Sequence, residues 1–245
     1  MLGILVLLIL SWGLLYLLEK QDLSILGFKP VNKRLRQFGY GFMISLILAI
    51  IFQLLDISLK SLDWSLNPSI QAVTILKMFW WDLISVLTEE LIFRGAMLYI
   101  LIKRFGANTA MIISAIAFGI FHWFSFGILG QIMPMIVVLI GTGLMGYAWA
   151  LAFCKTRSIF LAFGLHLGWN FTMNTIFSRG PLGDGLFTFS GGNMISDWYS
   201  LIGLWLGPLI IFIIIKYFVK PEKYALGNNN TMRPEGVKTS PSGKA

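Results

Sequence analysis

Two adjacent carboxylates, Glu89 and Glu90, lie inside a long apolar stretch of this sequence and are followed by Arg94. An acidic residue at the centre of a membrane helix costs about 2.5–3.5 kcal/mol, so its presence there indicates a function. Glu90 and Arg94 are four residues apart and share one helix face, where pairing limits the cost of burial. Glu89 points about 100° away around the helix. The pattern therefore predicts one paired carboxylate and one that is available for chemistry.

Two histidines and a pair of asparagines supply further polar groups in apolar stretches. His122 lies beside Trp123, where a lone histidine is ordinarily an interfacial residue. His166, Asn170 and Asn174 recur at helical spacing and form one polar stripe. The ordinary role of such a stripe is hydrogen bonding between membrane helices. Because the other apolar stretches that this stripe would face include two glutamates, we interpret His166 and Asn170 as parts of a site.

The composition indicates that lipid surrounds the elements that carry these residues. Of the 245 residues, 57% are hydrophobic and 12% are charged, whereas a soluble domain has about 25% charged residues. The formal net charge is +8, but the basic residues flank apolar runs and do not cluster on a soluble face. They mark the topology of a membrane protein, and we expect no nucleic-acid partner.

Apolar stretches of helix-spanning length predict an all-α, polytopic transmembrane bundle of seven to eight helices. The third stretch is about ten residues too long for one straight crossing, and Lys77, Trp80, Trp81 and Asp82 interrupt its beginning. We expect an interfacial start and a kink there, which would make eight helices. The seven predicted spans are 2–18, 37–58, 72–102, 107–124, 132–153, 158–178 and 200–219.

The basic residues predict how this bundle is oriented. When the loops are assigned alternately to two sides, fifteen Lys and Arg residues fall on one side and only Lys60 and Arg179 on the other. Cytoplasmic loops carry the excess of Lys and Arg. The amino terminus is therefore predicted to be outside and the carboxyl terminus cytoplasmic. Residues 1–18 have no basic segment before the apolar run and read as a retained first helix, not as a signal peptide.

The remaining segments predict a single transmembrane domain over 1–220 and a disordered cytoplasmic tail over 221–245, which is polar. The Gly-rich segment 179–199 reads as a flexible connector, with a lid over the site as the alternative. No β pattern is evident. The single cysteine, Cys154, excludes an intramolecular disulfide.

Depth in the membrane favours one common site. At about 1.5 Å per residue from the predicted cytoplasmic ends, Glu89 lies roughly 21 Å deep and His122 roughly 24 Å deep. His166 and Asn170 come out at roughly 14 and 20 Å. Helices of different direction thus place their polar groups within about two helical turns of each other. Unrelated ion pairs would have no reason to coincide in this way.

The three groups together resemble the signature of the CaaX-protease and bacteriocin-processing (CPBP) family of intramembrane proteases, which includes the Ras-converting CaaX endopeptidase. The resemblance covers about residues 82–178. The ordered motifs are Glu89-Glu90-x-x-x-Arg94, Phe118-x-x-x-His122 and His166-x-x-x-Asn170.

This resemblance implies a bundle of about eight helices that hydrolyses a peptide bond within a membrane cavity. It implies that Glu89 is the general base and that His122 helps to hold the attacking water. His166 and Asn170 would stabilise the oxyanion. Glu90 and Arg94, the remaining motif members, would be supporting residues.

General chemistry agrees with these roles. A carboxylate desolvated among apolar helices gains basicity, and an imidazole and a carboxamide one turn apart can donate to an oxyanion. The sequence has no H-E-x-x-H zinc helix. We favour glutamate chemistry without a cofactor, and the alternative is a zinc ion held by Glu89, His122 and His166.

Two other classes of protein remain open. One is a non-catalytic membrane immunity or peptide-binding protein on the same fold. The other is a small transporter with Glu89 and His166 in a proton relay, which predicts internal symmetry that the sequence does not show. For the protease, the expected partner is a membrane-associated peptide or protein. Whether that substrate is prenylated does not follow from the residues.

Overall fold

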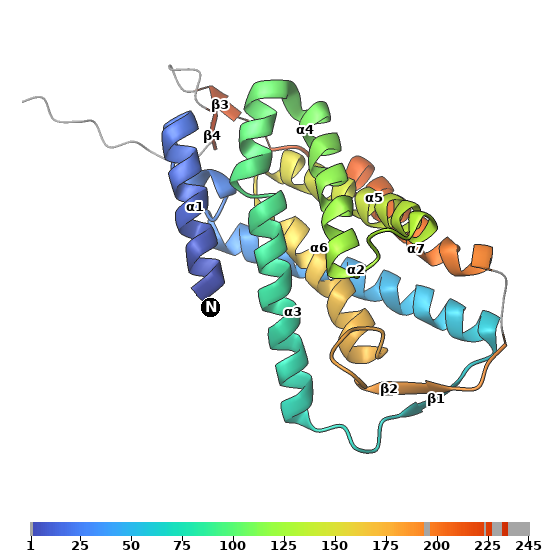
Figure 1. Cartoon of the computed structure of the whole chain (residues 1–245). Helices are drawn as coiled ribbons and strands as arrows, with labels where there is room; N and C mark the ends of the chain where they lie inside the picture. The colour runs from blue at the N-terminus through green and yellow to red at the C-terminus, as the bar shows by residue number, and fades with distance from the viewer. Residues whose placement is uncertain (1, 194–196, 223, 227–231, 235–245) are drawn as a thin grey trace, which may run out of the picture.

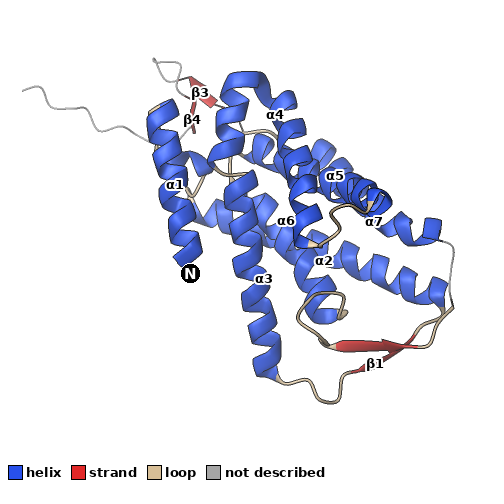
Figure 2. Ribbon diagram, viewed as in Figure 1, coloured by secondary structure: helices blue, strands red, loops and turns tan. Residues whose placement is uncertain are grey.

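A computed structural model of the chain describes residues 2–193, 197–222, 224–226 and 232–234. Helices dominate it (Figures 1 and 2). The elements in chain order are α1 (Leu2–Glu19), the 3-10 helix η1 (Leu23–Leu26), α2 (Val31–Lys60), β1 (Asp63–Leu66), α3 (Ala72–Phe93), α4 (Ala96–Ser125), α5 (Ile132–Thr156), α6 (Ile159–Phe171), the π-helix η2 (Thr172–Ile176), β2 (Phe187–Ser190), α7 (Asp197–Phe218), β3 (Tyr224–Leu226) and β4 (Met232–Pro234).

Four helical segments in the described part of the chain are long and apolar enough to cross a membrane: α1, α2, α3 together with α4, and α5. The fold is thus a helical, multi-span bundle, but the predicted number of seven to eight spanning helices is not confirmed. A spanning helix needs about 20 apolar residues. α6 has only 13 residues before it passes into η2.

The predicted kink near Lys77–Asp82 is wrong. α3 is continuous from Ala72 to Phe93, and the chain breaks instead at Arg94 and Gly95, inside the first motif. A Cβ atom on Gly95 would collide with the carbonyl oxygen of Leu91, so the break depends on glycine. The Ser114 hydroxyl donates to the carbonyl of Phe93 at 2.9 Å, which satisfies an acceptor freed at the end of α3.

A second break separates the two arms of α4. Gly106 has φ 78° and ψ 163°, which no helix contains, and the helix changes direction there (Figure 1). A positive φ favours glycine because it has no Cβ. This break coincides with the predicted loop between the spans 72–102 and 107–124.

The segments predicted to face the cytoplasm meet at one end of the bundle. The Ser158 hydroxyl, before α6, donates to the carbonyl of Gly27, before α2, at 2.8 Å. Arg104 in α4 lies 3.9 Å from Glu19 at the end of α1. Alternate loops of the chain are therefore adjacent, as the positive-inside argument requires.

The opposite end of the bundle carries a small antiparallel sheet that the sequence analysis did not expect. β1 pairs with β2, with Asp63 opposite Ser190 and Leu66 opposite Phe187 (Figure 1). β2 belongs to the segment interpreted as a flexible connector, so that interpretation is wrong for these four residues. Four-residue strands are too short for alternation to be a clear signal, and the pairing partner is more than 120 residues away in sequence.

Helix α6, which carries His166, packs closely against α2. Gly164 and Gly168 form a small-x-x-x-small pattern, which allows membrane helices to approach closely. A Cβ atom on either glycine would collide with a backbone carbonyl of α2, that of Phe38 or that of Phe42. His166, between the two glycines in sequence, is thereby fixed in position relative to α2.

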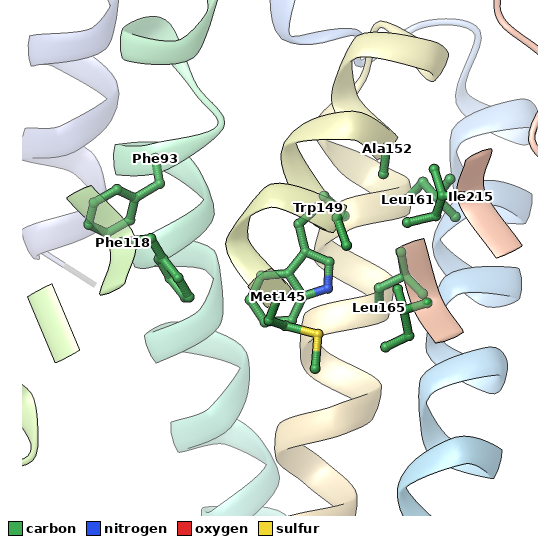
Figure 3. Packing of buried hydrophobic residues seen from close by; sticks show 11 residues of the cluster. Phe93, Phe118, Met145, Trp149, Ala152, Leu161, Leu165 and Ile215 are labelled. Atoms are coloured by element: carbon green, nitrogen blue, oxygen red, sulfur yellow. The ribbon is translucent and has the colours of Figure 1, made fainter. Parts of the chain in front are cut away.

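A hydrophobic cluster joins residues of α3, α4, α5, α6 and α7 (Figure 3). Its aromatic members are the rings that pack nearest to the polar groups described below. The larger buried members are Phe93, Phe118, Met145, Trp149, Leu161, Leu165, Ile211 and Ile215.

The predicted disordered tail lies mostly outside the described residues. Of 221–245, the structure describes Pro221, Glu222 and the short strands β3 and β4, which pair antiparallel. Glu222 contacts the helical bundle through Arg34. The division into a domain over 1–220 and a separate tail stays a prediction.

Candidate active site

The first motif forms a buried ion pair at the end of α3. The Nε atom of Arg94 donates to Oε2 of Glu90 at 2.8 Å, and Nη2 contacts Oε1. Both side chains have 0% of their area exposed. The i,i+4 pairing expected from the sequence is therefore present, with two parallel contacts between guanidinium and carboxylate.

Aromatic rings surround the guanidinium of Arg94. Its central carbon lies 4.5 Å from the ring centroid of Phe118, 5.2 Å from that of Trp149 and 5.7 Å from that of Phe93. Ring faces attract a cation, and the attraction is larger where water is excluded. The rings and Glu90 together offset the cost of burying this charge.

His166 connects the ion pair to the second glutamate. Its Nδ1 lies 2.8 Å from Oε1 of Glu90. A carboxylate paired with Arg94 is ionised and can only accept hydrogen bonds, so Nδ1 carries the proton and donates. The opposite atom, Nε2, lies 3.7 Å from Oε2 of Glu89. Trp149 stacks on the imidazole at 3.9 Å and 21°, which fixes the plane of the ring.

Glu89 has far fewer partners than Glu90. Its Oε2 is buried and has no hydrogen-bond partner within the part of the chain that the structure describes. Oε1 accepts a long hydrogen bond of 3.4 Å from the Ser85 hydroxyl, one turn earlier in α3. Glu89 and Glu90 thus differ as the sequence predicted: one is saturated by partners and the other faces an imidazole nitrogen.

His122 and His166 line the same cavity, which has a volume of about 100 Å³. Nδ1 of His122 lies 2.8 Å from the carbonyl of Phe118. A carbonyl only accepts, so Nδ1 donates and Nε2 carries a lone pair in the neutral ring. The rest of the wall is mostly apolar, with Met145, Trp149, Trp169 and Leu204 among its members.

Asn170 lies one helical turn after His166 and is half-buried, near the end of α6. Within the described residues no hydrogen bond of its side chain is found. It therefore shares the helix face of His166, but the structure does not connect it directly to the other site residues.

Asn174 pairs with a carboxylate that the sequence analysis placed at the membrane interface. Its Nδ2 donates to Oδ1 of Asp82 at 2.6 Å, and the Thr175 hydroxyl donates to Oδ2 at 3.4 Å. Asp82 is fully buried within the protein, and its interfacial depth stays a prediction. The spacing offered a signal: Asp82 is seven residues before Glu89, which places both on one face of a helix.

The zinc alternative required Glu89, His122 and His166 as three ligands. Among the described residues no group of three His, Cys, Asp or Glu side chains is placed to hold a metal ion. Nδ1 of each histidine is engaged with a protein oxygen, as is usual for an imidazole that binds metal through Nε2, and Nε2 of His166 faces Glu89. The three side chains are not gathered as a ligand set among the described residues, and the zinc alternative stays a prediction.

The helical bundle is that of a membrane protein, and its apolar core contains a buried cluster of carboxylates, an imidazole and a guanidinium. Residues 71–172 match the family model described as type II CAAX prenyl endopeptidase Rce1-like. The resemblance inferred from the three motifs is therefore confirmed over the segment that contains all of them. No curated protein and no solved structure matches the chain.

Proposed function

We propose that this protein is an intramembrane endopeptidase of the CAAX-processing type that hydrolyses a peptide bond with water activated by Glu89. The observation that carries the proposal is the contrast between two neighbouring carboxylates. Glu90 is held by Arg94 and His166, whereas Oε2 of Glu89 is buried, without a partner among the described residues, and 3.7 Å from His166 Nε2. The match to the Rce1-like family supports this activity at family level.

In the first step, Glu89 removes a proton from water while the water oxygen bonds to the peptide carbonyl carbon. A general base acts on a proton within hydrogen-bond reach. The neutral His122 offers Nε2 as an acceptor for the second proton of the same water, because its Nδ1 already donates to Phe118. The attacking oxygen is thereby oriented by two acceptors.

The tetrahedral oxyanion formed in this step needs donors. With Nδ1 fixed on Glu90, a protonated His166 presents Nε2–H, and Asn170 one turn away presents its amide N–H. Donors held in place in a water-poor site stabilise an oxyanion by several kcal/mol (about 2.7–4 for one donor). Glu89 then passes its proton to the leaving nitrogen as the C–N bond breaks, which returns the carboxylate to its first state.

Glu90 and Arg94 act through His166 and are positioning residues in this scheme. Glu90 fixes the orientation of the imidazole and stabilises its protonated form, and Arg94 keeps Glu90 ionised so that it can accept. Trp149 restricts the ring from its face. The apolar wall of the cavity suits a membrane-associated peptide or protein substrate with apolar side chains next to the cleaved bond.

The test is cleavage by purified protein in detergent or nanodiscs, with a library of apolar peptides that includes matched farnesylated and unmodified C-terminal sequences. Glu89→Gln and His166→Ala should each lower kcat/KM by about 10²–10⁴. Glu19→Gln, at the far end of α1, is the control and should keep wild-type activity. Cleavage that survives Glu89→Gln would remove the base. Binding of peptides without cleavage by any form would favour the non-catalytic peptide-binding alternative.

The orientation of the chain belongs to the same proposal. The end of the bundle that holds Ser158, Gly27 and Arg104 faces the cytoplasm, and the end with β1 and β2 faces outward. The fifteen-to-two division of basic residues supports this orientation. A membrane-impermeant thiol reagent applied to intact cells should label a cysteine placed at Asp184 and not one placed at Lys103, in a Cys154→Ser background.

A further inference from the structure

A second cavity, of about 510 Å³, lies at the end of the bundle where the basic segments meet. α2 and α7 form its long walls, and Thr156 and Leu161 contribute from the segment around the start of α6. It shares no lining residue with the cavity of His122 and His166. The function proposed above therefore does not use it.

The polar part of this groove has an excess of positive charge. Glu222 is its only carboxylate among the described lining residues, and it contacts Arg34 at 2.7 Å and Lys33 at 3.1 Å. Arg34 is buried, with 1% of its side chain exposed, and it pairs with this carboxylate through two nitrogens. Lys33 is half exposed and Lys220 is exposed. The two lysines of the groove thus outnumber its one carboxylate, which the buried arginine already satisfies.

The other part of the groove is apolar and turned toward lipid. Tyr40 and Phe218 have 68% and 78% of their area exposed, and Ile44 and Ile214 continue the wall deeper into the bundle. Ile44 follows Lys33 by eleven residues on α2, which corresponds to about 16 Å along a helix. One leaflet of the hydrocarbon core is about 15 Å thick, half of about 30 Å. The rise along α2 from Lys33 to Ile44 is thus about the thickness of one leaflet.

We propose that this groove binds one anionic phospholipid, with the phosphate at Lys33 and Lys220 and an acyl chain along Tyr40, Ile44 and Phe218. Basic pockets between membrane helices at the cytoplasmic side suit anionic lipid headgroups. A soluble phosphate would not use the apolar wall, and a zwitterionic lipid would not use the net positive charge. The bound lipid would bridge α2 and α7, the helices that Arg34 and Glu222 already tie together at this end.

Native mass spectrometry of the purified full chain tests the proposal. The protein is equilibrated in detergent with equimolar phosphatidylglycerol and phosphatidylcholine of matched acyl chains. Wild type should retain one phosphatidylglycerol with at least five-fold preference. The Lys33→Gln/Lys220→Gln double variant should lose that preference, whereas Lys103→Gln, an exposed lysine outside the groove, should keep it.

Thermal unfolding of the same proteins provides a second readout that needs no cleavage assay. Phosphatidylglycerol should raise Tm of wild type and of Lys103→Gln, and should raise that of the double variant much less. Inorganic phosphate and glycerol 3-phosphate should leave Tm unchanged. Equal retention of both lipids, an unchanged preference in the double variant, or equal protection by free phosphate would each overturn the proposal.

Discussion

Two arginine–glutamate pairs in the described part of the chain have a buried arginine but differ in location and surroundings. Arg94 and Glu90 lie one helical turn apart, and neither side chain is exposed. Arg34 and Glu222 come from segments 188 residues apart, and 17% of the Glu222 side chain is exposed at the end of the bundle. The first pair binds the imidazole of His166, whereas the second joins α2 to the segment after α7.

The difference shows what a buried ion pair can be used for. Replacing such a pair by apolar residues is often neutral or stabilising, so burial alone does not explain why charges are present. At the first pair, His166 requires an ionised acceptor at Nδ1, and Arg94 keeps that acceptor ionised. At the second, Arg34 also donates to the carbonyl of Thr156 at 3.0 Å, so that one side chain ties α2, the end of α5 and the segment after α7 together.

The largest effect is expected from breaking the first pair. Arg94→Met leaves the Glu90 carboxylate buried without its cation, which should cost about 3–5 kcal/mol of unfolding free energy. Cleavage should fall at least as far as in His166→Ala, because Glu90 would take up a proton and lose its role as acceptor. Denaturation in mild detergent, followed by tryptophan fluorescence, measures the first quantity, and peptide cleavage measures the second.

A paired replacement separates stability from chemistry at the same place. Glu90→Leu/Arg94→Met removes both charges and should recover most of the lost stability, as apolar replacements of buried ion pairs do. Cleavage should stay low, since His166 would have no acceptor at Nδ1. Recovery of both stability and cleavage in the double variant would show that the pair does not position the histidine.

The contrast between the pairs also explains what the sequence could reveal. The pairing of Glu90 with Arg94 and the separate direction of Glu89 follow from helical spacing, and both were predicted. The contact of Glu90 with His166 and the bonds of Arg34 with Glu222 join distant segments, and no local pattern reports them. The break at Gly95 was missed because apolar residues continue on both sides of it, while its cause is a close approach to Leu91.

Asp82, a buried carboxylate that contacts Asn174 and Thr175 in η2, should have an intermediate effect on stability. Asp82→Ala would leave the amide of Asn174 and the hydroxyl of Thr175 without their acceptor, which should cost about 1–3 kcal/mol. Asp82→Asn keeps an acceptor oxygen of similar shape and is the matched control, expected to lose less. Both are measured by denaturation. Equal stability of wild type and Asp82→Ala would mean that the contacts with η2 contribute nothing to the fold.

The smallest effect, and one that depends on pH, is expected at the second pair. Burial alone would raise the pKa of the Glu222 carboxyl, but hydrogen bonds from Arg34 and Lys33 lower that pKa below its ordinary value of 4.5. A lowered pKa means that Glu222 stabilises the folded state above about pH 4.5 and loses this contribution as the pH falls through the folded-state pKa.

Glu222→Gln should therefore be less stable than wild type by about 1 kcal/mol at pH 7, since a charged hydrogen-bond acceptor is lost at a partly exposed site. The two proteins should converge in stability as the pH falls from 4.5 through the lowered pKa, because wild-type Glu222 then becomes protonated too. A constant difference in unfolding free energy from pH 7 to pH 3 would instead mean that the variant acts through packing and not through the charge.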